Sequence, residues 1–365
     1  MNTYKTVFLL VFLWACGSST KNGTTTESTE KKVIKPKYAR FFQLEVDKND
    51  TALIILNPWK NGQPTQRIQL SGRSAAKSIV PMSTSFYGYL ELLGELDKIT
   101  GIENQDFVYN AQILERVNSG QIKELGESGV ISVEMTVRMN PDLLIISGTE
   151  ILGPNLNKIQ QAGLLILNDM DWQEQHPLGK AEWIKVFGLL LGKKEKADSI
   201  FGEIEHKYIA LCDTLRNRLP EKKANVILGY NYQGTWFMPG GKSYVAQYLA
   251  DAGAQYPFNT DTSSGSIPLS SELVFKQYSE YPVWLNPGSC RNKKDLLLLD
   301  SRYGRFSAFK KSAVYNNNRR SNVKGGNDFW ETSPANPHLV LADLVYIFYP
   351  QILPDHQLYF YQPLK

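Results

Sequence analysis

The sequence predicts an α/β fold of two lobes with parallel sheets, joined by one long helix and preceded by a small N-terminal β-hairpin extension. Apolar segments such as residues 143–146 and 164–167 alternate with segments of helical spacing, which is typical of a parallel sheet covered on both faces. Residues 179–215 carry apolar side chains at helical spacing, and the strand–helix pattern restarts at residue 224. The chain has 365 residues, 42% of them hydrophobic, which is enough for two lobes.

The start of the chain has the features of an export signal. Lys5 precedes an apolar run over residues 7–15, which is too short to cross a bilayer because a spanning helix needs ~20 apolar residues. This pattern describes a secretory signal peptide over residues 1–15. The run ends in Leu-Trp-Ala-Cys at residues 13–16, which resembles the lipobox of bacterial lipoproteins. The alternatives are an uncleaved anchor or an ordinary signal peptide followed by a chance cysteine.

The lipobox resemblance implies that Cys16 receives diacylglycerol, that cleavage precedes it and that its new amino group is acylated. Several acyl chains hold a protein more firmly than one, because each buried methylene adds ~0.8 kcal/mol. Residues 17–32 are almost entirely polar, so we predict a flexible tether over residues 16–37. We expect the protein to be lipid-anchored to a bacterial cell membrane with its folded body in the periplasm. Whether the inner or outer membrane holds the lipid stays open.

Charge and cysteine content narrow the function classes. The formal net charge is +4 at pH 7, and loss of Lys5 with the signal peptide lowers it by one, which is too little to argue for nucleic acid. With Cys16 lipidated, Cys212 and Cys290 remain. A disulfide between them is possible in an oxidising compartment, but no spacing pattern supports one, so we expect two buried free thiols.

The elements follow in order along the chain. Residues 38–72 combine strand-like runs at 42–46 and 51–56 with Asn-Pro and Asn-Gly turns, which predicts the β-hairpin extension. For the N-terminal lobe, residues 73–178, we predict strands at 78–80, 143–146 and 164–167 and helices at 86–96 and 133–139. The inter-lobe helix occupies residues 179–216. For the C-terminal lobe, residues 217–365, we predict strands at 224–228 and 283–285 and helices at 243–252, 270–278 and 336–348.

Motifs for catalysis and cofactor binding are lacking in the sequence. Gly-Gly-Lys-Ser at residues 240–243 resembles the end of a phosphate-binding loop, but the glycine required five residues before Gly241 is Trp236. We interpret it as a tight turn before a helix that Ser243 caps. No G-x-S-x-G elbow occurs, and no pair of the four histidines has metal-ligand spacing. We therefore predict neither an enzyme nor a resident cofactor or metal.

Candidate ligand-binding residues lie in loops expected at strand ends. Residues 83–85, Ser-Thr-Ser, form a polar strand-to-helix turn that suits either an anionic ligand or simple N-capping. Residues 230–237 interleave aromatic side chains with Asn, Gln and Gly, which suits a cleft for a large flat or catecholic ligand, with core packing as the alternative. Our predicted ligand-binding residues are first Trp236 and Tyr232, then Ser85, Thr84, Tyr109, Thr149 and Trp330.

Several stretches together resemble a known family. They lie at residues 79–85, 92–102, 139–144, 240–244, 249–254 and 270–275. From about residue 77 to 358 the chain resembles the periplasmic binding proteins for iron–siderophore complexes and vitamin B12. The resemblance implies two Rossmann-like lobes, a ligand between them, and one inter-lobe helix that limits their relative motion.

The resemblance also implies docking to a membrane permease. Each lobe of the family presents a glutamate that meets arginines on the permease, and by motif position these are Glu134 and Glu272. Such paired charges set orientation and encounter rate more than affinity. The alternative is two exposed carboxylates that interact with helix dipoles.

The sequence thus predicts a monomeric substrate-binding lipoprotein of an ABC importer. It would capture an iron chelate, namely a siderophore, and deliver it to the permease with its ATPase. Cobalamin and haem remain open as ligands in the same role. Two other classes also stay open: an extracytoplasmic hydrolase, and an accessory lipoprotein whose cleft has lost its ligand.

Overall fold

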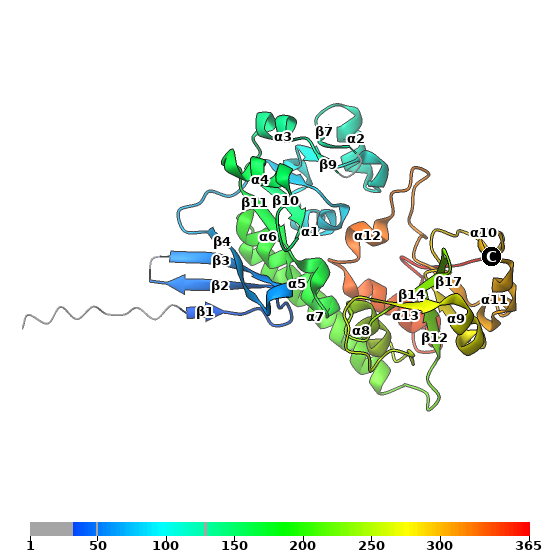
Figure 1. The fold of residues 1–365 in the computed structure, drawn as a ribbon. Helices are drawn as coiled ribbons and strands as arrows, with labels where there is room; N and C mark the ends of the chain where they lie inside the picture. The colour runs from blue at the N-terminus through cyan, green and yellow to red at the C-terminus, as the bar shows by residue number, and fades with distance from the viewer. Residues whose placement is uncertain (1–31, 49, 128–129) are drawn as a thin grey trace, which may run out of the picture.

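The computed structural model describes residues 32–48, 50–127 and 130–365. They form an N-terminal antiparallel sheet followed by two α/β lobes (Figure 1). Cys16 and the predicted signal peptide lie outside the described residues. Within the described ranges, no helix combines the length and apolar character that a membrane span requires.

The N-terminal extension contains the two strands of the predicted hairpin and two more, which together form a four-stranded antiparallel sheet. Its strands, in chain and sheet order, are β1 (Lys32–Ile34), β2 (Phe42–Asp47), β3 (Asp50–Asn57) and β4 (Gln63–Gln69). β1 lies within the segment predicted as tether. There, Val33 and Ile34 pair with Glu45 and Leu44 of β2. The apolar pair follows directly after the polar run, so the tether prediction extends too far toward the C-terminus.

Two buried glutamates of the N-terminal lobe hold the chain between β1 and β2. The carboxylate of Glu182 accepts hydrogen bonds from the backbone N–H groups of residues 37–39 at 2.7–3.0 Å. The carboxylate of Glu174 accepts from the N–H groups of Arg40 and Phe41 at 2.9–3.1 Å. These hydrogen bonds satisfy five successive backbone N–H groups and fix the extension to the folded body.

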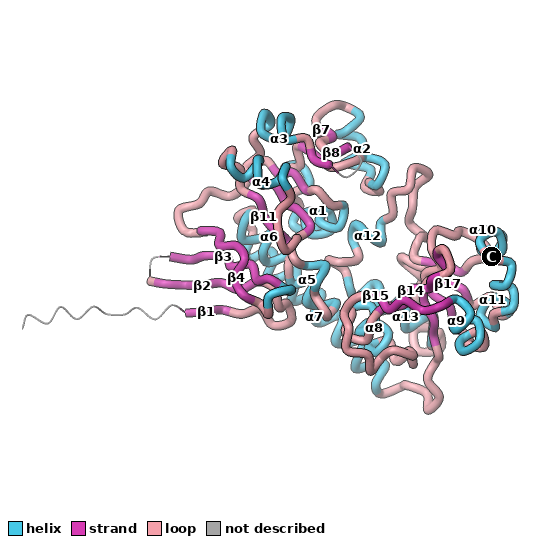
Figure 2. The backbone as a smooth tube through the Cα atoms, viewed as in Figure 1, coloured by secondary structure: helices cyan, strands magenta, loops and turns pink. Residues whose placement is uncertain are grey.

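The N-terminal lobe contains the three predicted parallel strands, in the sheet order β11-β10-β5. Figure 2 distinguishes the strands of this lobe from the helices around them by colour. The three parallel strands are β5 (Ile79–Pro81), β10 (Leu143–Ser147) and β11 (Ile166–Asp169). They are almost wholly buried because helices and loops cover both faces. The predicted helix at 86–96 is shorter, since Gly94 takes a left-handed conformation with φ 72° and ends it.

The other elements of this lobe connect the strands. They are η2 (Thr84–Phe86), α1 (Tyr87–Leu93), η3 (Leu96–Lys98), β6 (Gly101–Ile102), η4 (Gln105–Phe107), α2 (Ala111–Asn118), β7 (Lys123–Glu124), β8 (Gly126–Glu127), β9 (Val130–Ile131), α3 (Val133–Met139), α4 (Pro154–Gln161) and η5 (Asp171–Gln173). Helix α3 has the predicted bounds. The pairs β6–β7 and β8–β9 form two short separate sheets.

The inter-lobe segment is three helices rather than one over residues 179–216. They are α5 (Pro177–Glu182), α6 (Ile184–Leu190) and α7 (Lys194–Arg216). Gly192, with φ 69°, breaks the helical path between α6 and α7. The 23-residue α7 is the long helix that joins the lobes: it packs against α6 at one end and against α13 (Pro337–Phe348) at the other.

The C-terminal lobe repeats the parallel arrangement and adds antiparallel strands. Its main sheet has the order β12-β16-β17-β18, in which only β18 is antiparallel. The strands are β12 (Val226–Leu228), β16 (Val283–Leu285), β17 (Val314–Asn316) and β18 (Gln362–Pro363), with a second sheet of β13 (Asn231–Tyr232), β14 (Thr235–Pro239) and β15 (Ser266–Ser270). The helices are α8 (Tyr244–Asp251), α9 (Ser271–Tyr278), α10 (Lys293–Leu299), η6 (Ser301–Arg305), α11 (Ser307–Lys310), α12 (Asp328–Thr332) and α13.

Two details of this lobe were predicted. Ser243 caps α8: its hydroxyl accepts from the N–H of Ala246 at 3.1 Å. Cys290 of this lobe and Cys212 of α7 are free thiols, as expected; Cys290 is buried, whereas Cys212 is only partly buried. Burial raises the pKa of Cys290 to about 11, so its thiol stays protonated at neutral pH.

Candidate ligand-binding cleft

Helix α12 lies between the two lobes (Figure 1). On one side it packs against η2, which follows β5 of the N-terminal lobe. On the other side Phe329 and Trp330 of α12 line a pocket with Leu228, Asn286 and Asn317, at the ends of β12, β16 and β17. Ligands of open α/β sheets bind at this edge, so the region around α12 is the candidate cleft.

Two adjoining pockets form the wall of the C-terminal lobe. One has a volume of about 330 Å³ and the other, beside α12, about 50 Å³. Both are lined by Leu228, Tyr244, Val245 and Asn286, and the larger one also by Phe237. A mostly apolar and aromatic lining with a few polar groups is typical of small-molecule sites.

Trp236 does not line this cleft, and its assignment as a stacking residue is wrong. Its side chain is 0% exposed, stacks on Phe306 with ring centroids 6.0 Å apart, and donates from Nε1 to the backbone oxygen of Leu228 at 2.7 Å. The whole indole ring is therefore packed in the hydrophobic core. Alternation along β14 turns the next side chain, Phe237, outward, and it is 45% exposed. Phe237 is the residue that strand periodicity could have identified.

The other aromatic predictions have mixed outcomes. Trp330 is 54% exposed and lines the smaller pocket, so the structure brings it to the cleft. Tyr232 is exposed and lies edge-on to Tyr230 at 6.5 Å, but it is not among the lining residues of either pocket. Sequence reasoning missed Trp172, which follows β11 and donates from Nε1 to the backbone oxygen of Gly148 at 3.1 Å.

The predicted hydroxyl residues of the N-terminal lobe lie at its strand ends. Thr84 and Ser85 are in η2, where the Ser83 hydroxyl accepts from the N–H of Ser85 at 3.4 Å and contacts its hydroxyl at 2.9 Å. This is the N-capping alternative considered for the turn. Thr149 follows β10, and its hydroxyl donates to the backbone oxygen of Ile151 at 3.0 Å.

Tyr109 belongs to a different inter-lobe cavity. This cavity, of about 490 Å³, is lined from the N-terminal lobe by Glu91 and Tyr109 and from the C-terminal lobe by Arg320 and Asp328. The guanidinium of Arg320 lies 5.5 Å from the ring centre of Tyr109 and pairs with the Asp328 carboxylate. Burial, together with the nearby charge of Asp328, raises the pKa of Glu91.

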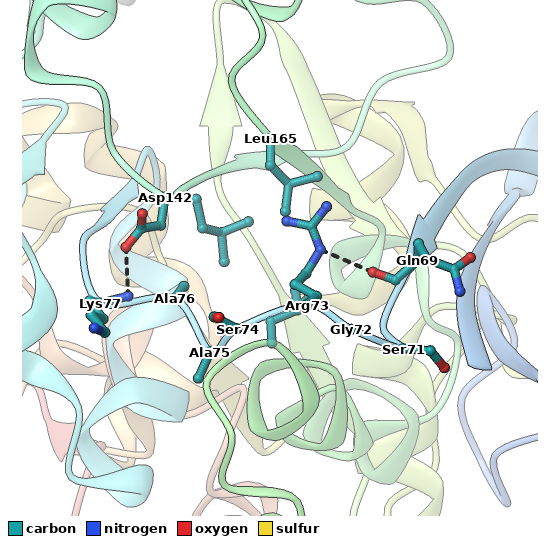
Figure 3. Close-up of a pocket in the computed structure, with 12 residues that line it drawn as sticks. Gln69, Ser71, Gly72, Arg73, Ser74, Ala75, Ala76, Lys77, Asp142 and Leu165 are labelled. Atoms are coloured by element: carbon teal, nitrogen blue, oxygen red, sulfur yellow. Dashed lines mark hydrogen bonds between the residues drawn. The ribbon is translucent and has the colours of Figure 1, made fainter. Parts of the chain in front are cut away.

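A third cavity, of about 570 Å³, lies at the opposite ends of the strands (Figure 3). It is lined by residues 69 and 71–77 together with Asp142, Leu143, Leu165 and Leu190. The Asp142 carboxylate accepts from the backbone N–H of Lys77 at 2.8 Å, just before β5 and β10 begin. Because ligands of this fold bind at the carboxyl ends of the strands, we do not assign the cavity to the cleft.

The two predicted docking glutamates occupy equivalent places. Glu134 is the second residue of α3, capped by Ser132, and Glu272 is the second residue of α9, capped by Ser270. Both carboxylates are exposed, and Glu134 pairs with Arg138 one turn later at 2.5 Å. Their permease partner stays a prediction.

Comparisons with known proteins identify relatives of the chain. It is 23% identical over 258 residues to an uncharacterized lipoprotein of Methanocaldococcus jannaschii, covering 69% of this chain and 59% of that protein. A second lipoprotein of the same organism is 21% identical over 270 residues, covering 70% and 64%. The chain thus spans less than two thirds of the length of these curated relatives.

Solved structures share the fold. A periplasmic heme binding protein from Pseudomonas aeruginosa is 19% identical, with a TM-score of 0.58, over 80% of this chain and 98% of that one. CeuE from Helicobacter pylori, in a Ni–His complex, is 15% identical with a TM-score of 0.58, over 83% and 90%. The model of the periplasmic binding protein family matches residues 79–318, which confirms the resemblance and leaves the N-terminal sheet outside the shared domain. The chain belongs to the periplasmic binding protein family.

Proposed function

We propose that this protein is the substrate-binding lipoprotein of an ABC importer and captures an iron chelate in the cleft around α12. The observation that carries the proposal is the aromatic lining, Phe237, Tyr244 and Trp330, at the carboxyl ends of the C-terminal strands. Aromatic faces suit a flat or catecholic ligand. A siderophore is the leading ligand class. Haem is the second candidate, because a similar structure is a heme binding protein.

Binding is tested by titrating the purified protein with a ferric tris-catecholate complex, haemin and cobalamin while following tryptophan fluorescence. We expect saturable quenching by at least one of the two iron complexes, because Trp330 is half-exposed in the cleft. Saturation by cobalamin alone would move the ligand to the corrin class. No response to any of the three would contradict the proposed function.

Substitution of Phe237 tests the position of the cleft. Because its exposed ring lines the larger pocket, we expect Phe237→Ala to weaken binding of the iron complex about 3- to 10-fold. The matched control is Phe107→Ala in η4, since that ring is 61% exposed but lines neither cleft pocket. Equal affinities of the two variants would place the ligand elsewhere.

The lipid anchor is part of the proposed mechanism. A tethered receptor stays near its membrane partner, which raises its effective concentration there. We expect cells grown with labelled palmitate to incorporate the label into the wild-type protein and into Cys212→Ala, but not into Cys16→Ala. Label in Cys16→Ala, or none in the wild type, would rule out lipidation of Cys16.

A further inference from the structure

The N-terminal extension reaches the strand-end edge of the N-terminal lobe. The turn between β3 and β4 is η1 (Pro58–Lys60), and its Trp59 ring lies 6.0 Å from the Trp172 ring, at an interplanar angle of 53°. In the same turn, Nζ of Lys60 lies 3.7 Å from a carboxylate oxygen of Glu150. Trp172 and Glu150 follow β11 and β10. The turn therefore lies at the carboxyl ends of these strands, on the same edge of the sheet as η2.

The position of Trp59 is fixed by a short-range hydrogen-bond network. The buried side chain of Asn57 accepts from the N–H groups of Trp59 at 2.9 Å and of Lys60 at 3.1 Å. Strand β4 is tied to the edge strand β11, because the Gln66 amide oxygen accepts from the N–H of Asn168 at 3.1 Å. The two indoles are thus held in place before any ligand arrives, which lowers the entropic cost of binding.

Both indoles are left substantially exposed, Trp59 by 42% and Trp172 by 46%. Helix α12 presents Trp330 and the C-terminal lobe presents Phe237, and both rings are exposed to a similar degree. Two exposed indoles in contact form a local apolar patch, and a conjugated ring that packs against them would cover it. The extension therefore adds one ring, Trp59, from outside the shared domain of residues 79–318, which itself contains Trp172.

We propose that Trp59 and Trp172 form an aromatic platform for a conjugated ring of the bound iron complex, so that the extension is part of the binding site. Because the two indoles are inclined by 53°, the ring stacks on the face of one and meets the edge of the other. This inference rests on the proposed function. The ring is either a catecholate of a siderophore or a porphyrin, and both present the same flat π surface. The platform would select ligands large enough to reach from the pocket at Phe237 to the N-terminal lobe.

The test compares the affinities of Trp59→Ala, Trp59→Phe and the Phe107→Ala control for a ferric tris-catecholate complex and for haemin. We expect Trp59→Ala to bind the cognate complex about 3- to 10-fold more weakly, and Trp59→Phe to recover most of the loss. The complex that shows the loss identifies the ring. Thermal midpoints of all three variants check that the fold is kept.

The outcomes separate the two proposals. If the wild type binds neither complex, the proposed function fails. If the wild type binds one complex and Trp59→Ala binds it equally well, the function stands and the platform is wrong. If Trp59→Ala lowers the thermal midpoint, the Trp59→Phe variant tests stacking instead. A folded Trp59→Phe variant with wild-type affinity supports stacking. A folded Trp59→Phe variant that binds as weakly as Trp59→Ala contradicts it.

Discussion

Reversing the charges of Glu134 and Glu272 together is expected to abolish ligand uptake by cells while leaving ligand affinity unchanged. The two carboxylates occupy equivalent places, each in the first turn of a capped and exposed helix, one in each lobe. A two-fold permease would meet one carboxylate with each half, and like charges at such a contact cost several kcal/mol. Each single reversal, Glu134→Lys or Glu272→Lys, is expected to reduce uptake less than the pair does.

The control for this experiment reverses exposed glutamates outside these helices. Glu115 in α2 and Glu221 in the C-terminal lobe are exposed, and their double reversal changes the net charge by the same amount. We expect Glu115→Lys/Glu221→Lys to transport normally. Unchanged uptake by the Glu134→Lys/Glu272→Lys variant would leave the two carboxylates as groups that interact only with their helix dipoles. Ligand affinity, measured by fluorescence quenching, shows that the cleft is intact in every variant.

Local patterns predicted the elements whose residues carry strong signals. The continuous apolar run at residues 143–146 predicted strand β10. The Asn-Pro-Asp sequence at residues 140–142, which interrupts a helix, predicted the end of α3. These features depend on neighbours in sequence. By contrast, the break at Gly192 stayed hidden because apolar spacing continues on both sides of it, and the structure alone shows its positive φ.

The cleft was harder to predict because its residues are defined by non-local packing. Trp236 and Phe237 are adjacent in sequence, and the direction in which each points depends on the pairing of β14 with β15. Predicting the place of Trp172 requires the order of the strands in the sheet. Predicting the place of Trp59 requires knowing that the extension docks onto β11. Composition identified an aromatic-rich loop but could not tell which ring faces the core.

Removing the carboxylate of Glu331 is expected to destabilise the contact between the lobes. Glu331, in α12, is fully buried and accepts hydrogen bonds from the backbone N–H groups of Tyr109 and Asn110 in the N-terminal lobe. Glu331→Ala removes the acceptor of both partly buried N–H groups, and we expect a total cost of about 1–3 kcal/mol.

The same carboxyl group gives stability a defined pH dependence. Burial raises the pKa of Glu331 to about 8, so the folded state holds a proton that the unfolded state releases near its ordinary pKa of about 4.5. The stability that the protonated Glu331 carboxyl group contributes is therefore fully present below pH 4.5 and is lost as the pH rises to about 8. Glu174, whose burial raises its pKa to about 7, acts in the same direction over a narrower range. Both groups make the protein less stable at pH 8 than at pH 5.

Urea midpoints measured from pH 5 to pH 9 separate the two glutamates. The wild type should lose stability up to about pH 8, whereas Glu331→Gln, which keeps one acceptor but cannot ionise, should lose it only up to about pH 7, through Glu174. Control variant Glu115→Gln, in an exposed position, should follow the wild-type curve. A Glu331→Gln curve that matches the wild type would show that Glu331 is ionised in the folded protein. The lobes would then be joined by a buried carboxylate whose charge the two N–H donors stabilise.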